Sequence, residues 1–333
     1  MYRKSIPIIL WIVTGLWSVL PVSNLWASCG SANCFLVTGT QEGIATPGGV
    51  TLDISYRYIP MDDFHKGSNN TNEAVVPKVD FENGIIIADH HREVRTVNEL
   101  MQVDLSYGIT ERFTLQVALP LINNRSHEHF DEVGTPDEFF SRQDGSSGIG
   151  DLRLIGKYAA VVRTRHLVVV GGGLKLPTGE YKLLDSKGEI NEPTIMPGTG
   201  SYDFVFNLFY DYQVIPHKLD AFFSGSYQLN TENDLDYEQG DQTLLNTGVN
   251  YLLTEKVSVS GQVNFRFSPR DEFKGQEVAS TGGTWINITP GINVQASDRL
   301  GLYTFVQIPV FQDVNEVNLV ARYGLALGAT YSF

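Results

Sequence analysis

Histidines occur in two polar stretches of the chain and are the residue type best suited to hold a metal ion. They are His65, His90, His91, His127 and His129. Alternate residues of an extended chain point to the same side, so His127 and His129 could present their rings together. Imidazole suits zinc, copper or nickel. No cysteine joins these histidines, however, and polar loops commonly carry histidine that binds nothing. We therefore expect no metal site.

The two cysteines, Cys29 and Cys34, lie close together in a segment of small residues. In an oxidising compartment a disulfide between them is the default expectation. A soft-metal or redox site is the alternative, and covalent haem attachment is excluded because it needs a C-x-x-C-H motif. Cys29 also raises the alternative of a lipidated N-terminus, although Trp26 stands where a lipoprotein signal has leucine.

Nucleophilic catalysis would need a nucleophile, a base and a group that orients the base. Ser126 and His127 are adjacent, but they lie in a polar stretch that favours a solvated pair. The glycine run 171–173 is not a phosphate loop, because no helix follows it. We therefore expect no catalytic residues, no enzyme activity and no cofactor.

The first residues have the order of a secretory signal peptide. Arg3 and Lys4 precede an apolar run over 6–22, and Ala27 offers a small residue for cleavage. We predict a signal peptide over 1–27, with a retained membrane anchor as the alternative. Its removal takes the net charge from −14 to about −16, which argues against nucleic acid as a partner.

The rest of the chain consists of segments with period-two alternation and no helical periodicity. No stretch of 18 or more apolar residues remains after the signal, so crossing a membrane would require a closed barrel. The predicted strands cover 49–60, 97–107, 111–121, 149–160, 166–176, 201–214, 219–229, 242–253, 257–268, 284–295, 299–311 and 319–333.

The connections between these strands alternate between short and long. Tight turns are expected at 108–110, 161–165, 215–218, 254–256 and 297–298, and long polar links at 61–96, 122–148, 177–200, 230–241, 269–283 and 312–318. Short periplasmic turns alternating with long extracellular loops are typical of a transmembrane barrel, whereas a soluble sandwich follows no such rule. We predict an all-β, antiparallel, up-and-down barrel of about twelve strands over 49–333 in the outer membrane of a Gram-negative bacterium.

The last strand illustrates the two faces of the predicted barrel. Tyr323, Leu325 and Leu327 share one face with Phe333, while the other face carries small and polar residues. The apolar face would contact outer-membrane lipids, with tyrosines at the interfaces. An aromatic C-terminus on such a strand resembles the signal read by the machinery that inserts these barrels, so we expect Phe333 to contact that machinery.

Charged residues on the opposite faces would line the lumen. The expected acids are Asp53, Asp104, Asp151, Asp203, Asp211 and Asp220, and the expected bases are Arg57, Arg153, Lys157, Lys175, Arg266 and Arg322. Such residues either line a water-filled passage or close the interior with salt bridges. The near balance of signs argues against strong ion selectivity. The segment 28–48, with the cysteine pair, could remain periplasmic or enter the barrel as a plug.

Three motifs in the central third resemble a family of outer-membrane barrels. Gly148-Ile-Gly-Asp-Leu-Arg-Leu-Ile-Gly-Lys-Tyr158 is followed by Gly173-Leu-Lys-Leu-Pro-Thr-Gly179 and by Gly198-Thr-Gly-Ser-Tyr-Asp203. These strand starts and ends resemble a family often described as transporters or as the putative MetA-pathway of phenol degradation. The resemblance implies passage of small solutes, hydrophobic or aromatic ones among them, across the outer membrane.

Two functions from different classes follow. The first is a passive channel or transporter that passes such solutes through a polar lumen. The second is a structural or docking barrel that holds a periplasmic partner, such as a redox protein, by the segment containing Cys29 and Cys34. Conductance across a planar bilayer would discriminate between them.

Overall fold

The computed structural model describes residues 27–28, 39–40 and 43–333. The predicted signal peptide lies outside these residues except for Ala27, and Cys29 and Cys34 lie outside them as well. Ala27–Ser28 (β1) pairs with Gly39–Thr40 (β2) in a small antiparallel sheet.

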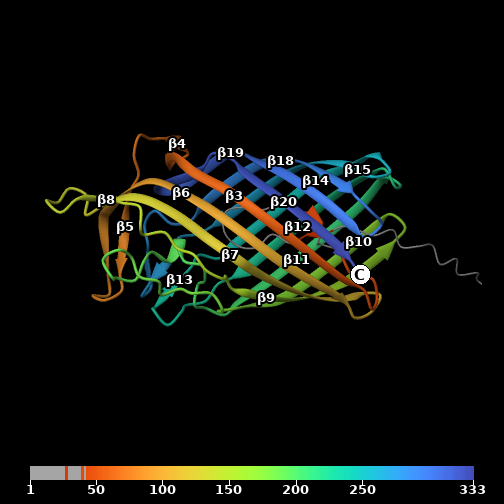
Figure 1. Cartoon of the computed structure of the whole chain (residues 1–333), viewed down its shortest axis with the longest axis horizontal. Helices are drawn as coiled ribbons and strands as arrows, with labels where there is room; N and C mark the ends of the chain where they lie inside the picture. The colour runs from red at the N-terminus through yellow and green to blue at the C-terminus, as the bar shows by residue number, and fades with distance from the viewer. Residues whose placement is uncertain (1–26, 29–38, 41–42) are drawn as a thin grey trace, which may run out of the picture.

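Twelve long antiparallel strands of the described chain close into a barrel (Figure 1). Neighbours in sequence pair throughout, and β3 pairs with both β20 and β6, which closes the sheet. The predicted all-β barrel is therefore confirmed. The strands are β3 (Val50–Gly67), β6 (Ile85–Gly108), β7 (Phe113–Asp131), β9 (Leu152–Arg163), β10 (His166–Leu176), β11 (Asp203–Ile215), β12 (Leu219–Leu229), β14 (Gln242–Thr254), β15 (Val257–Ser268), β18 (Gly283–Gln295), β19 (Leu300–Ala321) and β20 (Gly324–Ser332).

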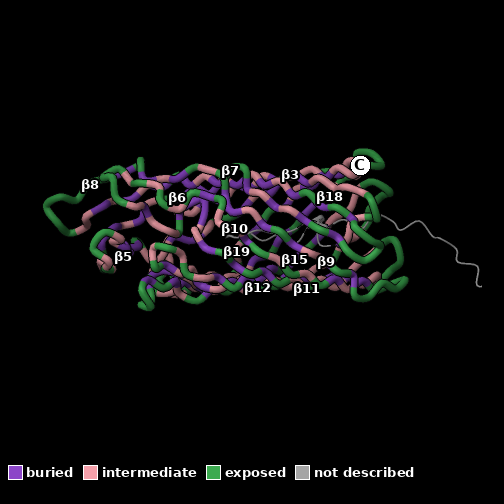
Figure 2. Tube along the Cα trace, turned by 90° about the horizontal axis from the view of Figure 1, so that it is seen from below, coloured by how far each residue is buried: buried purple, intermediate pink, exposed green. Residues whose placement is uncertain are grey.

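The two faces of these strands have opposite chemistry. Leu105, Phe206 and Ile288 are exposed on the outside, whereas Asp53, Gln116 and many other polar residues are buried inside. Figure 2 shows buried and exposed residues alternating along the strands. Apolar side chains on the outside suit lipid, because only a closed barrel satisfies the strand hydrogen bonds there. Among the described residues no helix is long and apolar enough to cross a membrane, a finding that does not concern strands.

Three strands extend well beyond the predicted bounds at the end with the long connections. The predicted link 61–96 is largely strand, since β3 runs to Gly67 and β6 begins at Ile85, and the first part of the link 122–148 is strand, since β7 runs to Asp131. These extensions carry polar residues on both faces, so they lack the alternation that marks a lipid-facing strand. Their hydrogen-bonded ladder rises above the membrane-spanning part of the barrel, at the left of Figure 1.

The long connections fold together at this end, which faces the cell exterior in outer-membrane barrels. Val79, Tyr237, Phe273 and Val278 form a small apolar core, with Phe81 and Ile86 packed on it. We call this apolar cluster the loop core. The short elements of the connections are β4 (Asn69–Asn70), β5 (Val75–Asp80), β8 (Phe139–Ser141), the 3-10 helix η1 (Pro193–Ile195), β13 (Tyr237–Glu238), β16 (Glu272–Phe273) and β17 (Gln276–Glu277).

The predicted link 312–318 contains the reversal of the chain. Strand β19 pairs with β18 as far as Val314, turns at Glu316, whose φ is +53°, and then runs back along β3. A bend at 322–323 follows, opposite Pro60, which has no N–H to pair. The last residue, Phe333, donates its backbone N–H to Val50 O at 2.9 Å, and its side chain is exposed.

The described end of the N-terminal segment contacts the interior of the barrel at the short-turn end. Ala45 N donates to the hydroxyl of the buried Thr114 at 2.8 Å. Ile44 packs against Ala159, Leu167 and Val169, which are buried in the barrel wall.

Candidate functional site

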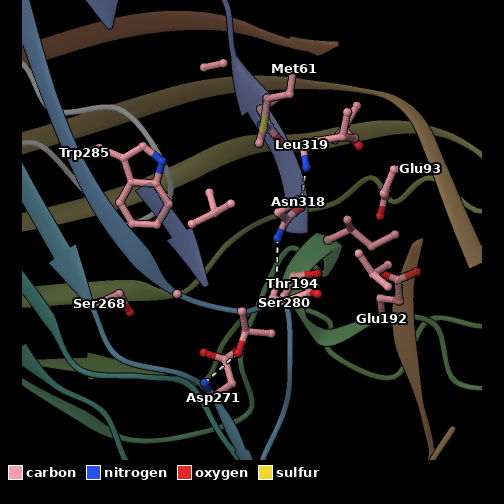
Figure 3. A pocket seen from close by; sticks show the side chains of 18 of the residues that line it. Met61, Glu93, Glu192, Thr194, Ser268, Asp271, Ser280, Trp285, Asn318 and Leu319 are labelled. Carbon is pink, nitrogen blue, oxygen red and sulfur yellow. Dashed lines mark hydrogen bonds between the residues drawn. The ribbon is translucent and has the colours of Figure 1, made fainter. Parts of the chain in front are cut away.

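A cavity of about 220 Å³ lies inside the barrel beneath the long connections (Figure 3). Its walls come from β3, β5, β6, β7, β14, β15, β18, β19 and β20 and from the connections 177–202, 230–241 and 269–282. The apolar part of the lining includes Ile59, Met61, Val76, Val79, Ile195, Trp285, Val314 and Leu319. Tyr237 and Val278 belong both to this lining and to the loop core, so the folded connections shape the cavity.

Polar groups are distributed among these apolar walls. The guanidinium of Arg266 lies over the Trp285 ring, 4.3 Å from its centroid. Asn318 Nδ2 donates to Ser280 O at 2.5 Å, and Asp271 N donates to Thr281 Oγ1 at 2.8 Å (Figure 3). An apolar pocket with a few oriented polar groups is typical of small-molecule sites.

Two aromatic side chains fill the lumen next to the cavity. Tyr303 and Phe305 form a buried cluster with Ile59 and Ala326, and Ile59 also lines the cavity. The rings lie against glycines of the neighbouring strands: a Cβ at Gly328 would come within 2.1 Å of Tyr303 Cζ. The lumen is therefore partly filled by side chains.

Two of the predicted lumen acids accept hydrogen bonds within this interior. Asp53 accepts from Tyr303 Oη at 2.9 Å and from Thr330 Oγ1 at 2.5 Å. Asp104 accepts from Gln102 Nε2 at 2.7 Å and from Gln116 Nε2 at 3.0 Å. Both acids are buried, as are Arg57 and Lys157 of the predicted bases.

Three more predicted residues meet where β9 starts, β10 ends and β11 starts. Lys175 Nζ lies 3.1 Å from Asp151 Oδ2 and 2.5 Å from Asp203 Oδ2. The three side chains are 2%, 6% and 0% exposed, respectively. Asp151 also accepts from Gly179 N at 3.0 Å and from Thr199 N at 2.9 Å. We call this group of Asp151, Lys175, Thr199 and Asp203 the rim clasp.

The rim clasp unites the three sequence motifs that suggested the family. Asp151 belongs to the first motif, Lys175 and Gly179 to the second, and Thr199 and Asp203 to the third. The chains pass so closely that a Cβ at Gly198 would come within 2.5 Å of the Gly179 carbonyl carbon. Glycine is therefore required at this crossing, and the motifs are explained by packing and charge pairing at the rim.

The remaining predicted residues occupy varied positions. Arg153 is buried and donates to Gln228 Oε1 at 2.9 Å. Asp211 is buried, while Asp220 and Arg266 are half-buried. Arg322 differs from its predicted inward position: its exposed guanidinium lies 3.3 Å from Asp62 Oδ1. The alternation is interrupted at the bend at 322–323, because Ala321, Tyr323 and Gly324 all line the cavity, although the sequence places Tyr323 on the lipid-facing side.

The histidines that the sequence places on polar loops are instead largely buried on the β6 and β7 extensions. His91 and Glu93 of β6 face His127 of β7 and Glu192, which precedes η1. Burial alone would raise the pKa of Glu192, but His91 and His127 lower it well below its ordinary value. Sequence reasoning missed both glutamates. The spacing of two residues in His91-x-Glu93 and His127-x-His129 was the available signal, since it places both members on one strand face.

A closed barrel with an apolar outside and a polar interior defines an outer-membrane β-barrel protein. The chain belongs to the family described as Putative MetA-pathway of phenol degradation, whose model matches residues 67–324. No curated protein sequence matches the chain.

One solved structure shows the same fold. An outer membrane channel from Pseudomonas putida F1 aligns with a TM-score of 0.62 and 16% identity, over 87% of this chain and 97% of that chain. A FadL homologue from Pseudomonas aeruginosa aligns with a TM-score of 0.42 and 11% identity, over 85% of this chain and 90% of that chain.

Proposed function

We propose that the protein is an outer-membrane channel for small solutes, hydrophobic or aromatic ones among them, and that the cavity is its outer solute site. The observation that supports this proposal most is the lining of the cavity. Trp285, Tyr237 and Met61 offer surfaces for an apolar ring, while Asn318 and Arg266 offer polar groups for a hydroxyl. The description of the family, which refers to phenol degradation, agrees with a solute of this kind.

The polar interior of the barrel supports a route with little charge selectivity. Acids and bases lie together along it, since Asp53 and Asp104 are buried in the same interior as Arg57 and Lys157, and Lys175 is paired with Asp151 and Asp203. We propose that the other predicted lumen residues also pair with groups of opposite charge. We further propose that the protein has no catalytic function. The contacts of Ile44 and Ala45 support a role for the segment before β3 as part of a plug at the periplasmic mouth.

The test is conductance and solute flux through the purified full chain in planar bilayers and liposomes. Met61→Trp would fill the cavity from β3, and Ile54→Trp would add the same ring on the outer, lipid-facing side of that strand. We expect phenol flux to fall in Met61→Trp and to remain unchanged in Ile54→Trp. Equal flux in the two variants would show that the cavity lies off the route.

A folded chain that gives no openings and no flux would overturn the channel function and favour a docking barrel.

We also propose that the barrel-insertion machinery recognises Phe333, whose exposed ring lies 4.8 Å from the Tyr331 ring, centroid to centroid. Replacing Phe333 with serine should lower the amount of folded barrel in the outer membrane without changing the conductance of each inserted molecule.

A further inference from the structure

The structure brings two imidazoles and two carboxylates together at the edge of the cavity, and none of them is needed for the channel function proposed above. His91, Glu93, His127 and Glu192 each offer one ligand atom, and these atoms lie within 4.8 Å of one another. His91 and His127 are both 2% exposed and Glu93 is 7% exposed, while the side chain of Glu192 is 18% exposed, so three of the four are buried and the fourth is half-buried. Burying two carboxylates is costly unless positive charge compensates them.

The separations of the ligand atoms suit a shared ion. His91 Nε2 lies 2.9 Å from Glu192 Oε1 and 3.5 Å from Glu93 Oε1, and His127 Nε2 lies 3.9 Å from Glu192 Oε1. Four ligands at about 2.0–2.2 Å from a tetrahedral zinc ion lie about 3.3–3.6 Å from one another. The observed distances span this interval, so small rotations of the side chains would complete the set.

The orientation of these groups is the second, independent observation. His91 Nε2, His127 Nε2 and Glu93 Oε2 are buried and make no hydrogen bond. His91 Nε2 makes no hydrogen bond of ordinary geometry, although Glu192 Oε1 lies 2.9 Å away. Atoms that approach this closely without hydrogen-bonding can all direct their lone pairs at one point between them.

The surroundings of His127 have the form of an outer coordination shell. The hydroxyl of Thr96 lies 2.9 Å from His127 Nδ1, which fixes the ring and leaves Nε2 directed at the cluster. Metal-bound histidines characteristically use their second nitrogen in this way. The backbone of Glu192 is held in turn, since Glu192 N donates to Asn191 Oδ1 at 2.8 Å and Asn191 Nδ2 donates to Asp144 O at 2.6 Å.

We propose that His91, Glu93, His127 and Glu192 form a binding site for a divalent transition-metal ion, of which zinc is the best match. Nitrogen and carboxylate ligands in a compact set of four suit zinc better than magnesium or calcium, which prefer six or more oxygens. Glu93, His127 and Glu192 also line the cavity, and Figure 3 shows Glu93 and Glu192 together on one side of it. The ion would join β6 and β7 to the connection 177–202 at the edge of the solute site.

Zinc binding to the purified, folded full chain tests the proposal, after chelation and dialysis, by calorimetry and by metal analysis. We expect one zinc ion per chain. Glu192→Gln and His127→Gln should each weaken binding by more than about 100-fold, because even the loss of an outer-shell partner costs about 10–100-fold. Thr96→Val removes the outer-shell partner of His127 and should weaken zinc binding by about 10–100-fold.

Two matched variants control for unrelated effects. Glu180→Gln removes an exposed carboxylate from the same connection, and His65→Gln removes an imidazole from the same end of the barrel; both lie outside the cluster. Both should bind zinc as the unchanged chain does. Substoichiometric binding by the unchanged chain, or equal affinity in Glu192→Gln and Glu180→Gln, would overturn the proposal.

Cobalt(II) absorption of the unchanged chain gives a readout that does not depend on the folding of any variant. Intense visible bands of a tetrahedral nitrogen and oxygen site are expected, and the weak spectrum of the hydrated ion would contradict the site. None of these measurements requires a conducting channel. Failure of the channel function and failure of the metal site are therefore distinguishable.

Discussion

Replacing Lys175 with methionine should be among the most destabilising single changes at the rim of the barrel. Methionine keeps much of the length of the side chain but removes its charge, so Asp151 and Asp203 would be left buried side by side. Removing one partner of a buried ion pair costs about 3–5 kcal/mol. The cost here should be near the lower bound, because Gln228 Nε2 and Thr231 N also donate to Asp203, at 3.1 Å each.

The assay is urea unfolding of the barrel in lipid vesicles, followed by tryptophan fluorescence. Lys182→Met is the matched control, since Lys182 Nζ lies 2.6 Å from Asp234 Oδ2 and both side chains are exposed. Exposed pairs contribute little, so this control should leave the midpoint unchanged. Adding Asp203→Asn to Lys175→Met should restore part of the lost stability, because one uncompensated charge is removed. Equal midpoints for Lys175→Met and Lys182→Met would refute the charge-pairing role of the rim clasp.

Two further changes test the packing of the connections. Gly198→Ala should lower the free energy of unfolding by about 1–3 kcal/mol, because the added Cβ would collide with the Gly179 backbone. Gly261→Ala is the control and should leave the free energy of unfolding unchanged, because no atom lies within 4 Å of the added Cβ. Equal losses in the two variants would contradict the close packing of Gly198 against Gly179. Burial, and then Asp271, hold the pKa of Tyr237 well above 10, so the phenol contributes stability below its ordinary pKa that is lost as pH rises through the raised value. Protease cleavage of the outer connections should therefore increase as the pH rises above about 10 in the unchanged chain and depend less on pH in Tyr237→Phe. A cleavage rate of the unchanged chain that does not depend on pH in this range would contradict the reasoning.

The strands that cross the membrane could be predicted from the sequence because lipid imposes a strict alternation on them. β10, β12 and β15 have the predicted bounds 166–176, 219–229 and 257–268. Above the membrane that constraint ends. The extensions of β3, β6 and β7 carry polar residues on both faces, which makes them indistinguishable from loops in a pattern of hydrophobicity.

The cluster beside the cavity could be predicted only in part, for a different reason. His91-x-Glu93 and His127-x-His129 have the spacing of a shared strand face, but nothing local connects them to Glu192. That residue is brought to the cluster by the fold of 177–202, where Lys78 Nζ lies 3.1 Å from Asp185 Oδ2 and 2.5 Å from Glu189 Oε2. Contacts between residues so distant in sequence follow from the tertiary structure of the connections and leave no periodic pattern.

The position of the family motifs bears on how solute preference can vary within this fold. Asp151, Lys175 and Asp203 satisfy one another at the rim of β9, β10 and β11, and none of them lines the cavity among the residues that the structure describes. The cavity is instead lined from β3, β6, β18 and β19 and from the loop core, which lie outside the three motifs. The rim clasp therefore stabilises the barrel without contacting a solute in the cavity. Residues such as Met61 and Trp285 can change while the clasp is kept, so the motifs identify the barrel, and the solute must be inferred from the lining of the cavity.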